Sequence, residues 1–434
     1  MRIAILGFGR EGKSILRFLK KNHGRDEIWI LDSNNNLKTP PGVKRILGKH
    51  YLRDLAAFNL IYCSPGIPLN LPQIARIRRK GVPFSSLTKL FFELATKRTR
   101  NIIGVTGTKG KGTTSTLLYE MLKRAGKEVF LVGNIGTPAL SVISKLTKDS
   151  WIVYELSSFQ LQNLTQSPHI ALVTETFPDH QDSHRTLREY YAAKANIVRY
   201  QKKNDFAFYF KHQAMSRAIG GKSKGRKHAV DERGFSLFRA EHLKIPGLHN
   251  FKNAVLAATV AGALDIPKTT ILRAVKLFRG LEHRLEFVKK VMVRQTHHKN
   301  KSAIYFYNDS ASTNPHTTAA ALRAFPAIQK VLIIGGQDKN LNYTPLAKAV
   351  RYEKNLSALV LMGENRKKIA RALKGTRAPL QFARNLREAV VRARRALPDG
   401  GVVLFSPGAT SFDMFRDYRD RGEQFKKLVY QLTK

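Results

Sequence analysis

The chain has little of what would place it in an oxidising compartment or in a membrane. Cys63 is the only cysteine among 434 residues, so the chain forms no internal disulfide and no zinc site built from cysteines. Its longest apolar runs, such as VLIIGG from Val331 and GVVLF from Gly401, are as short as β-strands and too short to cross a bilayer. The apolar stretch at the N-terminus is too brief for a secretory signal. We therefore expect a soluble protein of the reducing cytoplasm that has no membrane partner.

Acidic residues are also scarce. The chain has 31 aspartates and glutamates against 76 lysines and arginines, which gives a net charge of +45 and a pI near 10.5. Such a charge is typical of proteins that bind polyanions, so a basic nucleic-acid-binding protein is one hypothesis. The basic residues are spread along the whole chain, however, and the short cluster typical of a tail or loop is KSKGRK at 222–227. We favour a basic surface that attracts anionic small molecules, and do not expect nucleic acid as a functional partner.

Strand and helix patterns alternate along the chain in three blocks. Apolar, strand-length runs such as those at 2–6, 151–155 and 330–334 are followed by stretches with helical periodicity. This alternation predicts α/β domains, each with a largely parallel sheet that helices cover on both faces. We expect three domains, at residues 1–95, 96–280 and 281–434.

The glycine-rich run GVTGTKGKGTT at 104–114 lies between a predicted strand and a predicted helix. Glycines let backbone N–H groups turn toward phosphate oxygens, the helix presents its positive end, and a lysine supplies charge. The glycines and the lysine are spaced one residue further apart than in the usual P-loop, and Gly112 stands where a Ser or Thr normally follows. We therefore predict that Lys111 contacts the β- and γ-phosphates of ATP, and that Thr113, or else Thr114, supplies a hydroxyl to magnesium.

A second glycine motif opens the chain. Gly7, Gly9 and Gly12 form G-x-G-x-x-G, and Asp32 follows about twenty residues later, as in a dinucleotide fingerprint. A glycine turn at a helix N-terminus also holds other diphosphates, so the motif alone does not require a dehydrogenase. Two nucleotide-type loops favour an enzyme that uses ATP and a second substrate. We expect a Rossmann-like N-terminal domain and a central P-loop mononucleotide-binding domain, and a Rossmann-like C-terminal domain for the third α/β block.

Three further residues of the central block stand near predicted strand ends or on a helix. Glu155 ends a buried strand, where a carboxylate either faces the ligand crevice and holds Mg²⁺ or faces solvent. His180, between Asp179 and Asp182, either contacts a metal or phosphate or belongs to an ordinary polar loop. Considered by itself, Lys194 is interpreted as one of many surface lysines.

Taken together, these motifs resemble those of the Mur ligases, in order over nearly the whole chain. The matching segments are GVTGTKGKGTT (104–114), GNIGTPAL (133–140), YELSSFQL (154–161), DH (179–180) with AAK ending at Lys194, GLHNFKNAVLA (247–257), LEHRLE (281–286), NDSASTN (308–314), GGQDKN (335–340) and SPGATSFDMFRDYRDRGEQF (406–425). The P-loop is shared with folylpolyglutamate synthase, whereas ELSSFQL and the C-terminal segment are typical of the member that adds D-glutamate.

The resemblance implies an ATP-dependent amide-bond-forming ligase of cytoplasmic peptidoglycan synthesis. Such an enzyme phosphorylates the carboxylate of UDP-N-acetylmuramoyl-L-alanine, and the amine of D-glutamate then attacks the acyl phosphate. The resemblance also implies two magnesium ions in the site. We expect the chain to act as a monomer.

The resemblance further assigns residues to each ligand. The implied catalytic residues are Lys111, Glu155, His180 and Lys194. The UDP-linked substrate would contact Gly9, Arg10, Glu11, Asp32, Ser33, Ser64, Pro65, Gly66 and Asn134. ATP would contact Gly107, Thr108, Lys109, Gly110, Lys111, Gly112, Thr113, Thr114, Asn253, Arg284 and Asp309. The metal ligands would be Thr113, Glu155, His180 and Lys194, the last as a carbamate formed with CO2 (N6-carboxylysine), which requires a neutral amine first. The incoming glutamate would contact Lys339, Ser411 and Tyr418.

One position departs from the family pattern. The segment NDSASTN has Ala311 where the family usually has a lysine that helps position the glutamate. Either Lys339 or another nearby base compensates, or the amino-acid site is altered, so a ligase that adds L-glutamate is an alternative. A folylpolyglutamate-type ligase is a second alternative, against which the UDP-type first domain and ELSSFQL argue. A basic nucleotide- or nucleic-acid-binding protein without ligase activity is the third.

Overall fold

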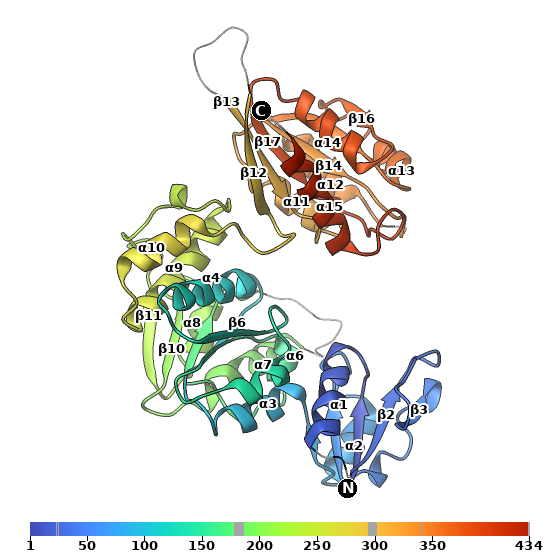
Figure 1. The fold of residues 1–434 in the computed structure, drawn as a ribbon, viewed down its shortest axis with the longest axis vertical. Coiled ribbons are helices and arrows are strands. Elements are labelled where there is room, and N and C mark those ends of the chain that lie inside the picture. Colours follow the sequence, from blue (N-terminus) through green and yellow to red (C-terminus); the bar gives the residue numbers. More distant parts are fainter. Residues whose placement is uncertain (23, 25, 178–185, 294–301, 340, 433–434) are drawn as a thin grey trace. The chain divides into compact units, whose positions relative to one another are not determined.

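The structure, a computed structural model, describes residues 1–22, 24, 26–177, 186–293, 302–339 and 341–432. Three β-sheets follow one another along this part of the chain (Figure 1). By their internal contacts, the residues form two compact units. The first unit comprises residues 1–237 and 252–274, and the second comprises residues 238–251 and 275–434.

The first sheet has the strand order β3-β2-β1-β4-β5 and belongs to the first unit. Its strands are β1 (Arg2–Leu6), β2 (Glu27–Asp32), β3 (Lys44–Leu47), β4 (Leu60–Cys63) and β5 (Phe84–Ser85), with helices α1 (Arg10–Asn22), α2 (Pro72–Arg79) and α3 (Leu87–Ala95). All its strands are parallel, and Leu6 is in register with Leu31 and Cys63. The loops that follow β1, β2 and β4 therefore meet at one edge of the sheet.

The second sheet has the order β11-β10-β9-β6-β8-β7 and is also parallel. Its strands are β6 (Ile102–Thr106), β7 (Val129–Gly133), β8 (Trp151–Glu155), β9 (Ile170–Val173), β10 (Phe206–Phe210) and β11 (Arg226–Val230). The helices of this region are α4 (Lys111–Arg124), α5 (Ala139–Val142), α6 (Ser158–Leu161), α7 (Leu187–Arg199), α8 (Ala214–Gly220), α9 (Leu248–Ala263) and α10 (Lys268–Leu277). The central strand β6 is fully buried and has β8 and β9 as neighbours, so the loops after these three strands lie side by side.

The third sheet, in the second unit, has the order β12-β13-β17-β14-β15-β16. Its strands are β12 (Glu286–Val293), β13 (Ser302–Asn308), β14 (Lys330–Ile334), β15 (Leu356–Leu361), β16 (Leu380–Phe382) and β17 (Gly401–Phe405), with helices α11 (Pro315–Leu322), α12 (Thr344–Tyr352), α13 (Arg366–Ala372), α14 (Leu386–Arg395) and α15 (Tyr418–Gln431). Alternate residues of β14 enter two different apolar clusters: Leu332 lies in one, and Val331 and Ile333 lie in the other. Both faces of the sheet are therefore buried, which explains why the strand is apolar throughout.

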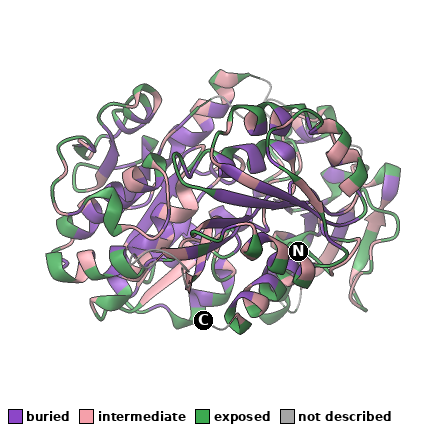
Figure 2. Ribbon diagram, turned by 90° about the horizontal axis from the view of Figure 1, so that it is seen from above, coloured by how far each residue is buried: buried purple, intermediate pink, exposed green. Residues whose placement is uncertain are grey.

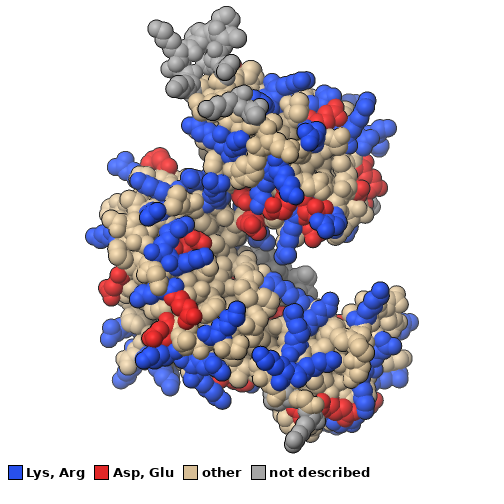
Figure 3. Space-filling view, in the orientation of Figure 1, with Lys and Arg blue, Asp and Glu red and all other residues tan. Residues whose placement is uncertain are grey.

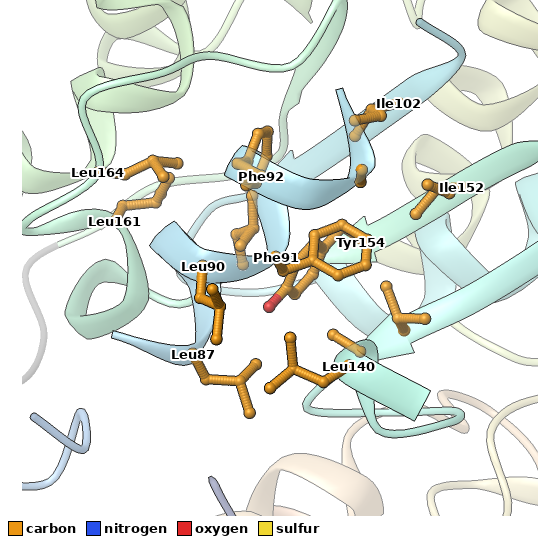
Figure 4. Packing of buried hydrophobic residues seen from close by; sticks show 14 of the residues in the cluster. Leu87, Leu90, Phe91, Phe92, Ile102, Leu140, Ile152, Tyr154, Leu161 and Leu164 are labelled. Carbon is orange, nitrogen blue, oxygen red and sulfur yellow. The ribbon is translucent and has the colours of Figure 1, made fainter. Parts of the chain in front are cut away.

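Helix α3 joins the core of the central sheet. Phe91 and Phe92 pack against Tyr154 of β8, with ring centroids 5.1 Å and 6.0 Å from the tyrosine ring (Figure 4). All three side chains are fully buried. The first and second sheets consequently share one apolar cluster, which extends from Ile3 to Ile219 in the chain.

The prediction of an α/β protein with largely parallel sheets is confirmed. Buried residues concentrate in the strands, and the helices carry exposed outer faces (Figure 2). The strands predicted at 2–6, 151–155 and 330–334 have the predicted bounds. The antiparallel edge strand β12 was missed. Among the described residues, no helix combines the length and apolarity that a bilayer crossing needs. The three domain boundaries stay predictions.

Candidate active site

The glycine-rich loop turns tightly between β6 and α4. Gly107 has a φ of +149° and Gly110 a φ of +86°, values that strain residues with a side chain. A Cβ on Gly107 would lie 1.9 Å from Thr174 Oγ1, and one on Gly110 would lie 2.1 Å from Asn253 Oδ1. Both positions therefore require glycine. The first N–H groups of a helix have no intrahelical partner. At α4 the N-cap residue is Gly110, which has no side chain to accept a hydrogen bond from them, so these N–H groups suit an anion.

Two lysine ammonium groups meet at one carbonyl oxygen of this loop. Lys111 Nζ donates to Gly107 O at 3.0 Å and to Thr108 O at 3.1 Å, and Lys194 Nζ donates to Gly107 O at 2.7 Å. Lys194 is 2% exposed, and its Nζ lies 4.7 Å from the ring centroid of Tyr190. The interpretation of Lys194 as a surface lysine is therefore wrong, because the face of α7 that carries it packs against the loop.

The two threonines predicted as sources of a metal hydroxyl differ in their environment. Thr113, the preferred one, lies partly exposed in the first turn of α4. Thr114 is fully buried, and its Oγ1 has no hydrogen-bond partner among the described residues. The assignment of Thr113 as the ligand stays a prediction.

Glu155 lies at the carboxyl end of β8, in register with Val105 of the neighbouring β6. It is 6% exposed, so the solvent-facing alternative for this strand end is wrong. A buried carboxylate beside a loop that carries hydroxyls offers the oxygen ligands that Mg²⁺ prefers. The predicted ligand His180 and its neighbours Asp179 and Asp182 lie outside the described residues. Within the described part of the chain, no group of three or more His, Cys, Asp or Glu side chains is placed to hold a metal ion.

The loop rests on residues 174–177, which follow β9 and which we call the platform. Thr174 Oγ1 donates to Lys109 O at 2.6 Å, and the carbonyl of Glu175 accepts the N–H groups of Thr108 and Lys109 at 2.8 Å and 3.2 Å. Phe177 N donates to Thr108 Oγ1 at 2.9 Å. These bonds occupy the N–H groups of Thr108 and Lys109, so the N–H groups at the start of α4 stay available to an anion.

A pocket of about 460 Å³ opens at the edge of the first sheet where the loops after β1, β2 and β4 meet. Its lining includes all nine residues predicted for the UDP-linked substrate, namely Gly9, Arg10, Glu11, Asp32, Ser33, Ser64, Pro65, Gly66 and Asn134. Tyr51, Ile67 and Pro68 also line it and were missed. They carry apolar surface in loops, and nothing in their spacing indicates a ligand.

The polar groups of this pocket are held in place by the backbone around them. Asp32 accepts the N–H of Phe8 at 2.8 Å, and Ser64 Oγ donates to Gly7 O at 2.7 Å. Burial raises the pKa of Glu11, although a hydrogen bond from Gln160 and the nearby Arg10 charge oppose this effect. Its second oxygen is buried and has no partner among the described residues, so the pocket presents an unsatisfied acceptor to a polar ligand.

In the second unit, Asp309 is the most constrained of the predicted residues. It follows β13, is 5% exposed and accepts hydrogen bonds from the hydroxyls of Ser312 and Ser406 and from the N–H of Leu285. Burial raises its pKa to about 6, and these hydrogen bonds with the Arg284 charge oppose the rise. Arg284 itself is exposed.

The residues predicted around the glutamate lie on loops of the same unit. Ser411 is buried, Tyr418 is 36% exposed at the start of α15, and Lys339 is exposed with its Nζ 5.5 Å from the ring centroid of Phe412. Tyr418 O accepts the Ser310 hydroxyl at 2.8 Å, so the start of α15 lies against the segment that carries Ala311.

Arg421 was not singled out in the sequence, yet it joins these loops. Its fully buried guanidinium donates to Ser310 Oγ at 3.0 Å, to Ser310 O at 2.8 Å and to Ala409 O at 3.0 Å. Burial lowers its pKa to about 10. Only its place inside the segment RDYRDRGEQF distinguishes it in the sequence from the many other arginines.

Three family profiles match the chain in the order of its sheets. They are the Mur ligase MurD-like N-terminal domain at residues 1–86, the Mur ligase middle domain at 105–261 and the Mur ligase glutamate ligase domain at 283–408. Among solved structures, a UDP-N-acetylmuramate-alanine ligase from Thermotoga maritima is 21% identical, with a TM-score of 0.56 over 99% of both chains. A MurF ligase from the same organism, solved with ADP, is 16% identical with a TM-score of 0.55, over 99% of this chain and 95% of its own. These two likenesses concern the fold.

Curated relatives match over the full length. The UDP-N-acetylmuramoylalanine--D-glutamate ligase of Acetivibrio thermocellus is 34% identical over 99% of this chain and 96% of its own. The enzyme of the same name from Symbiobacterium thermophilum is 34% identical over 100% of this chain and 98% of its own. A glycine-rich loop, a pocket at the first sheet and full-length identity of this degree together show that the chain belongs to the Mur ligase family.

Proposed function

We propose that this chain joins D-glutamate to UDP-N-acetylmuramoyl-L-alanine in peptidoglycan synthesis, with ATP as the phosphoryl donor. The observation that carries the proposal is the full-length identity to relatives that bear this activity in their names. The pocket supports it, because the predicted contacts to the UDP-linked substrate line one cavity. The proposal includes a monomer that acts in the cytoplasm and needs no nucleic acid partner.

In the proposed reaction, the substrate carboxylate takes the γ-phosphoryl group of ATP, and the glutamate amine then displaces phosphate from the acyl phosphate. Lys111 and the N–H groups at the start of α4 would neutralise charge on the transferring group. Two magnesium ions would add positive charge there, and we propose Glu155, Thr113, His180 and Lys194 as their ligands.

The burial of Lys194 supports its proposed role as a carbamate. Lys194 is 2% exposed, and its Nζ lies 2.7 Å from Gly107 O of the glycine-rich loop. Once carbamylated, Lys194 would present an anionic oxygen donor beside the loop.

The test is ADP release by the full chain with UDP-N-acetylmuramoyl-L-alanine and ATP, with D-glutamate and L-glutamate in parallel. We expect release that depends on D-glutamate and on the UDP-linked substrate. Release with L-glutamate alone would assign the alternative stereochemistry, which Ala311 motivates, and release with neither would overturn the proposal.

Substitution of Lys194 tests the carbamate. We expect Lys194→Ala to lose at least about a hundredfold in kcat, because a metal ligand is lost. A short carboxylic acid that fills the vacated space should restore part of the activity. Full activity of Lys194→Ala without additives would contradict the carbamate. Lys203→Ala, an exposed lysine outside the site, is the control.

A further inference from the structure

Glu175 and Lys252 form an ion pair beside the phosphate-binding loop. Lys252 Nζ lies 2.9 Å from Glu175 Oε1, and the two side chains are 25% and 15% exposed. Both belong to the first compact unit, although they lie far apart in the chain. The pair is thus partly shielded from water, where a charge pair restrains geometry better than on an open surface.

The backbone of Glu175 holds the loop from one side. Its carbonyl accepts the N–H groups of Thr108 and Lys109, as part of the platform at 174–177. The same residue therefore holds the loop through its backbone and is itself held by Lys252 through its side chain.

Helix α9 contacts the loop from a second direction. Asn253, which follows Lys252, packs against Gly110 so closely that a Cβ there would lie 2.1 Å from its Oδ1. Two consecutive residues of α9 thus act on the segment 107–110. Asn253 packs directly against Gly110, and Lys252 acts through Glu175, whose carbonyl binds Thr108 and Lys109.

We propose that Lys252 and Glu175 are positioning residues that hold the loop in the form that receives the triphosphate. Without the pair, the platform is no longer tied to α9 and the backbone at 107–109 can shift, which weakens nucleotide binding. Neither substitution removes a side chain that is proposed to act on the reacting atoms. The inference rests on the proposed function only in taking ATP as the nucleotide.

The test measures ATP binding to the full chain in the presence of Mg²⁺ by calorimetry, without the other substrates. We expect Lys252→Met and Glu175→Gln each to weaken binding roughly three- to tenfold. The double variant should bind no more weakly than the weaker single variant, because both remove the same contact. A variant that exchanges the two residues, Lys252→Glu with Glu175→Lys, should recover part of the ATP affinity that the single variants lose.

The matched control is Lys211→Met, which removes an exposed ion pair with Asp231 in the same unit, 3.2 Å long. It should bind ATP as the unchanged chain does. In turnover assays, the KM for ATP should rise in the two single variants by the factor seen in binding, while kcat changes less than about twofold. A structural defect would lower the melting temperature and the amount of active enzyme instead, and the exchange variant would not repair it.

Unchanged ATP affinity in both single variants would overturn the inference. So would weakened binding in Lys252→Met alone, because that result would assign Lys252 a direct contact with phosphate. Additive losses in the double variant would also overturn it. A chain that shows the expected binding pattern but joins no glutamate would overturn the proposed function and leave this inference intact.

Discussion

At the scale of single residues, the glycines of the loop at 104–114 differ from other glycines of the chain in what surrounds them. Gly110 and Gly126 both have a positive φ, +86° and +76°. A Cβ on Gly110 meets Asn253, whereas one on Gly126 meets nothing within 4 Å. The two positions therefore separate the cost of backbone strain from the cost of a collision.

We expect Gly126→Ala to lower the free energy of unfolding by about 1–2 kcal/mol, the cost of a left-handed conformation alone. Gly110→Ala should cost more and should also weaken ATP binding, because Asn253 or the loop must move. Chemical denaturation and nucleotide titration of both variants measure this. Equal losses in the two variants would show that the contact with Asn253 is unimportant.

Asp309 makes a prediction about pH. Its pKa is raised to about 6 in the folded chain from an ordinary value near 3.8, mainly by burial. The folded state therefore binds the proton more tightly than the unfolded state. This difference in proton binding adds about 3 kcal/mol to the free energy of unfolding below about pH 4. The contribution is lost as the pH rises through about 6.

Asp309→Asn should remove this fall of the unfolding free energy between pH 4 and 6, which urea denaturation across that range measures. Asp231→Asn is the control. The pKa of the partly exposed Asp231 is lowered to about 2, chiefly by a hydrogen bond from Lys211, so its charge in the folded state does not change in this window. If the unfolding free energy of Asp309→Asn fell between pH 4 and 6 as much as that of the unchanged chain, the fall could not be assigned to Asp309.

At the scale of elements, the loops after β13 and β17 are joined by Arg421 of α15. Arg421→Met leaves the carbonyls of Ser310 and Ala409 without their donors in a buried place. We expect a loss of about 3 kcal/mol in the free energy of unfolding. Arg419→Met, two residues earlier and exposed, should cost less than about 0.5 kcal/mol. Similar melting temperatures for the two variants would contradict the role of Arg421.

The elements that could be predicted from sequence are those whose local pattern matches their place in the fold. The strands at 2–6, 151–155 and 330–334 are apolar because the parallel sheets bury both faces. β12 was missed because an edge strand that pairs antiparallel has a mixed burial pattern, which is hard to tell from a loop.

The pocket at the first sheet gathers the residues that the family resemblance assigned to the UDP-linked substrate. Most of them follow strands of one parallel sheet, whose carboxyl ends share one edge. The burial of Lys194 and of Arg421 was not predictable from composition, since 76 lysines and arginines look alike in the sequence. Tertiary packing alone decides which few of them are enclosed.

At the scale of the whole molecule, the charge is spread rather than gathered. Lysine and arginine side chains are scattered over the face shown in Figure 3, between uncharged areas and smaller groups of carboxylates. A net charge of +45 makes the folded chain repel itself more than the expanded unfolded chain does.

Screening should therefore stabilise the fold. We expect the melting temperature to rise as sodium chloride is raised from about 10 mM to about 150 mM, where the Debye length falls from about 30 Å to about 8 Å. Scanning calorimetry without nucleotide measures it. A melting temperature that falls over this range would show that attractive ion pairs outweigh the repulsion.

The path of the chain between its two compact units sets an order on synthesis. Residues 238–251 belong to the second unit, but the chain returns to the first for residues 252–274 before it enters the second for good. On the ribosome, the first unit stays incomplete until residue 274 has emerged. The segment 238–251 is made before the rest of its own unit, residues 275–434, has been synthesised. During that interval the nascent chain exposes apolar surface such as Phe238 and Ile245, which the finished protein buries.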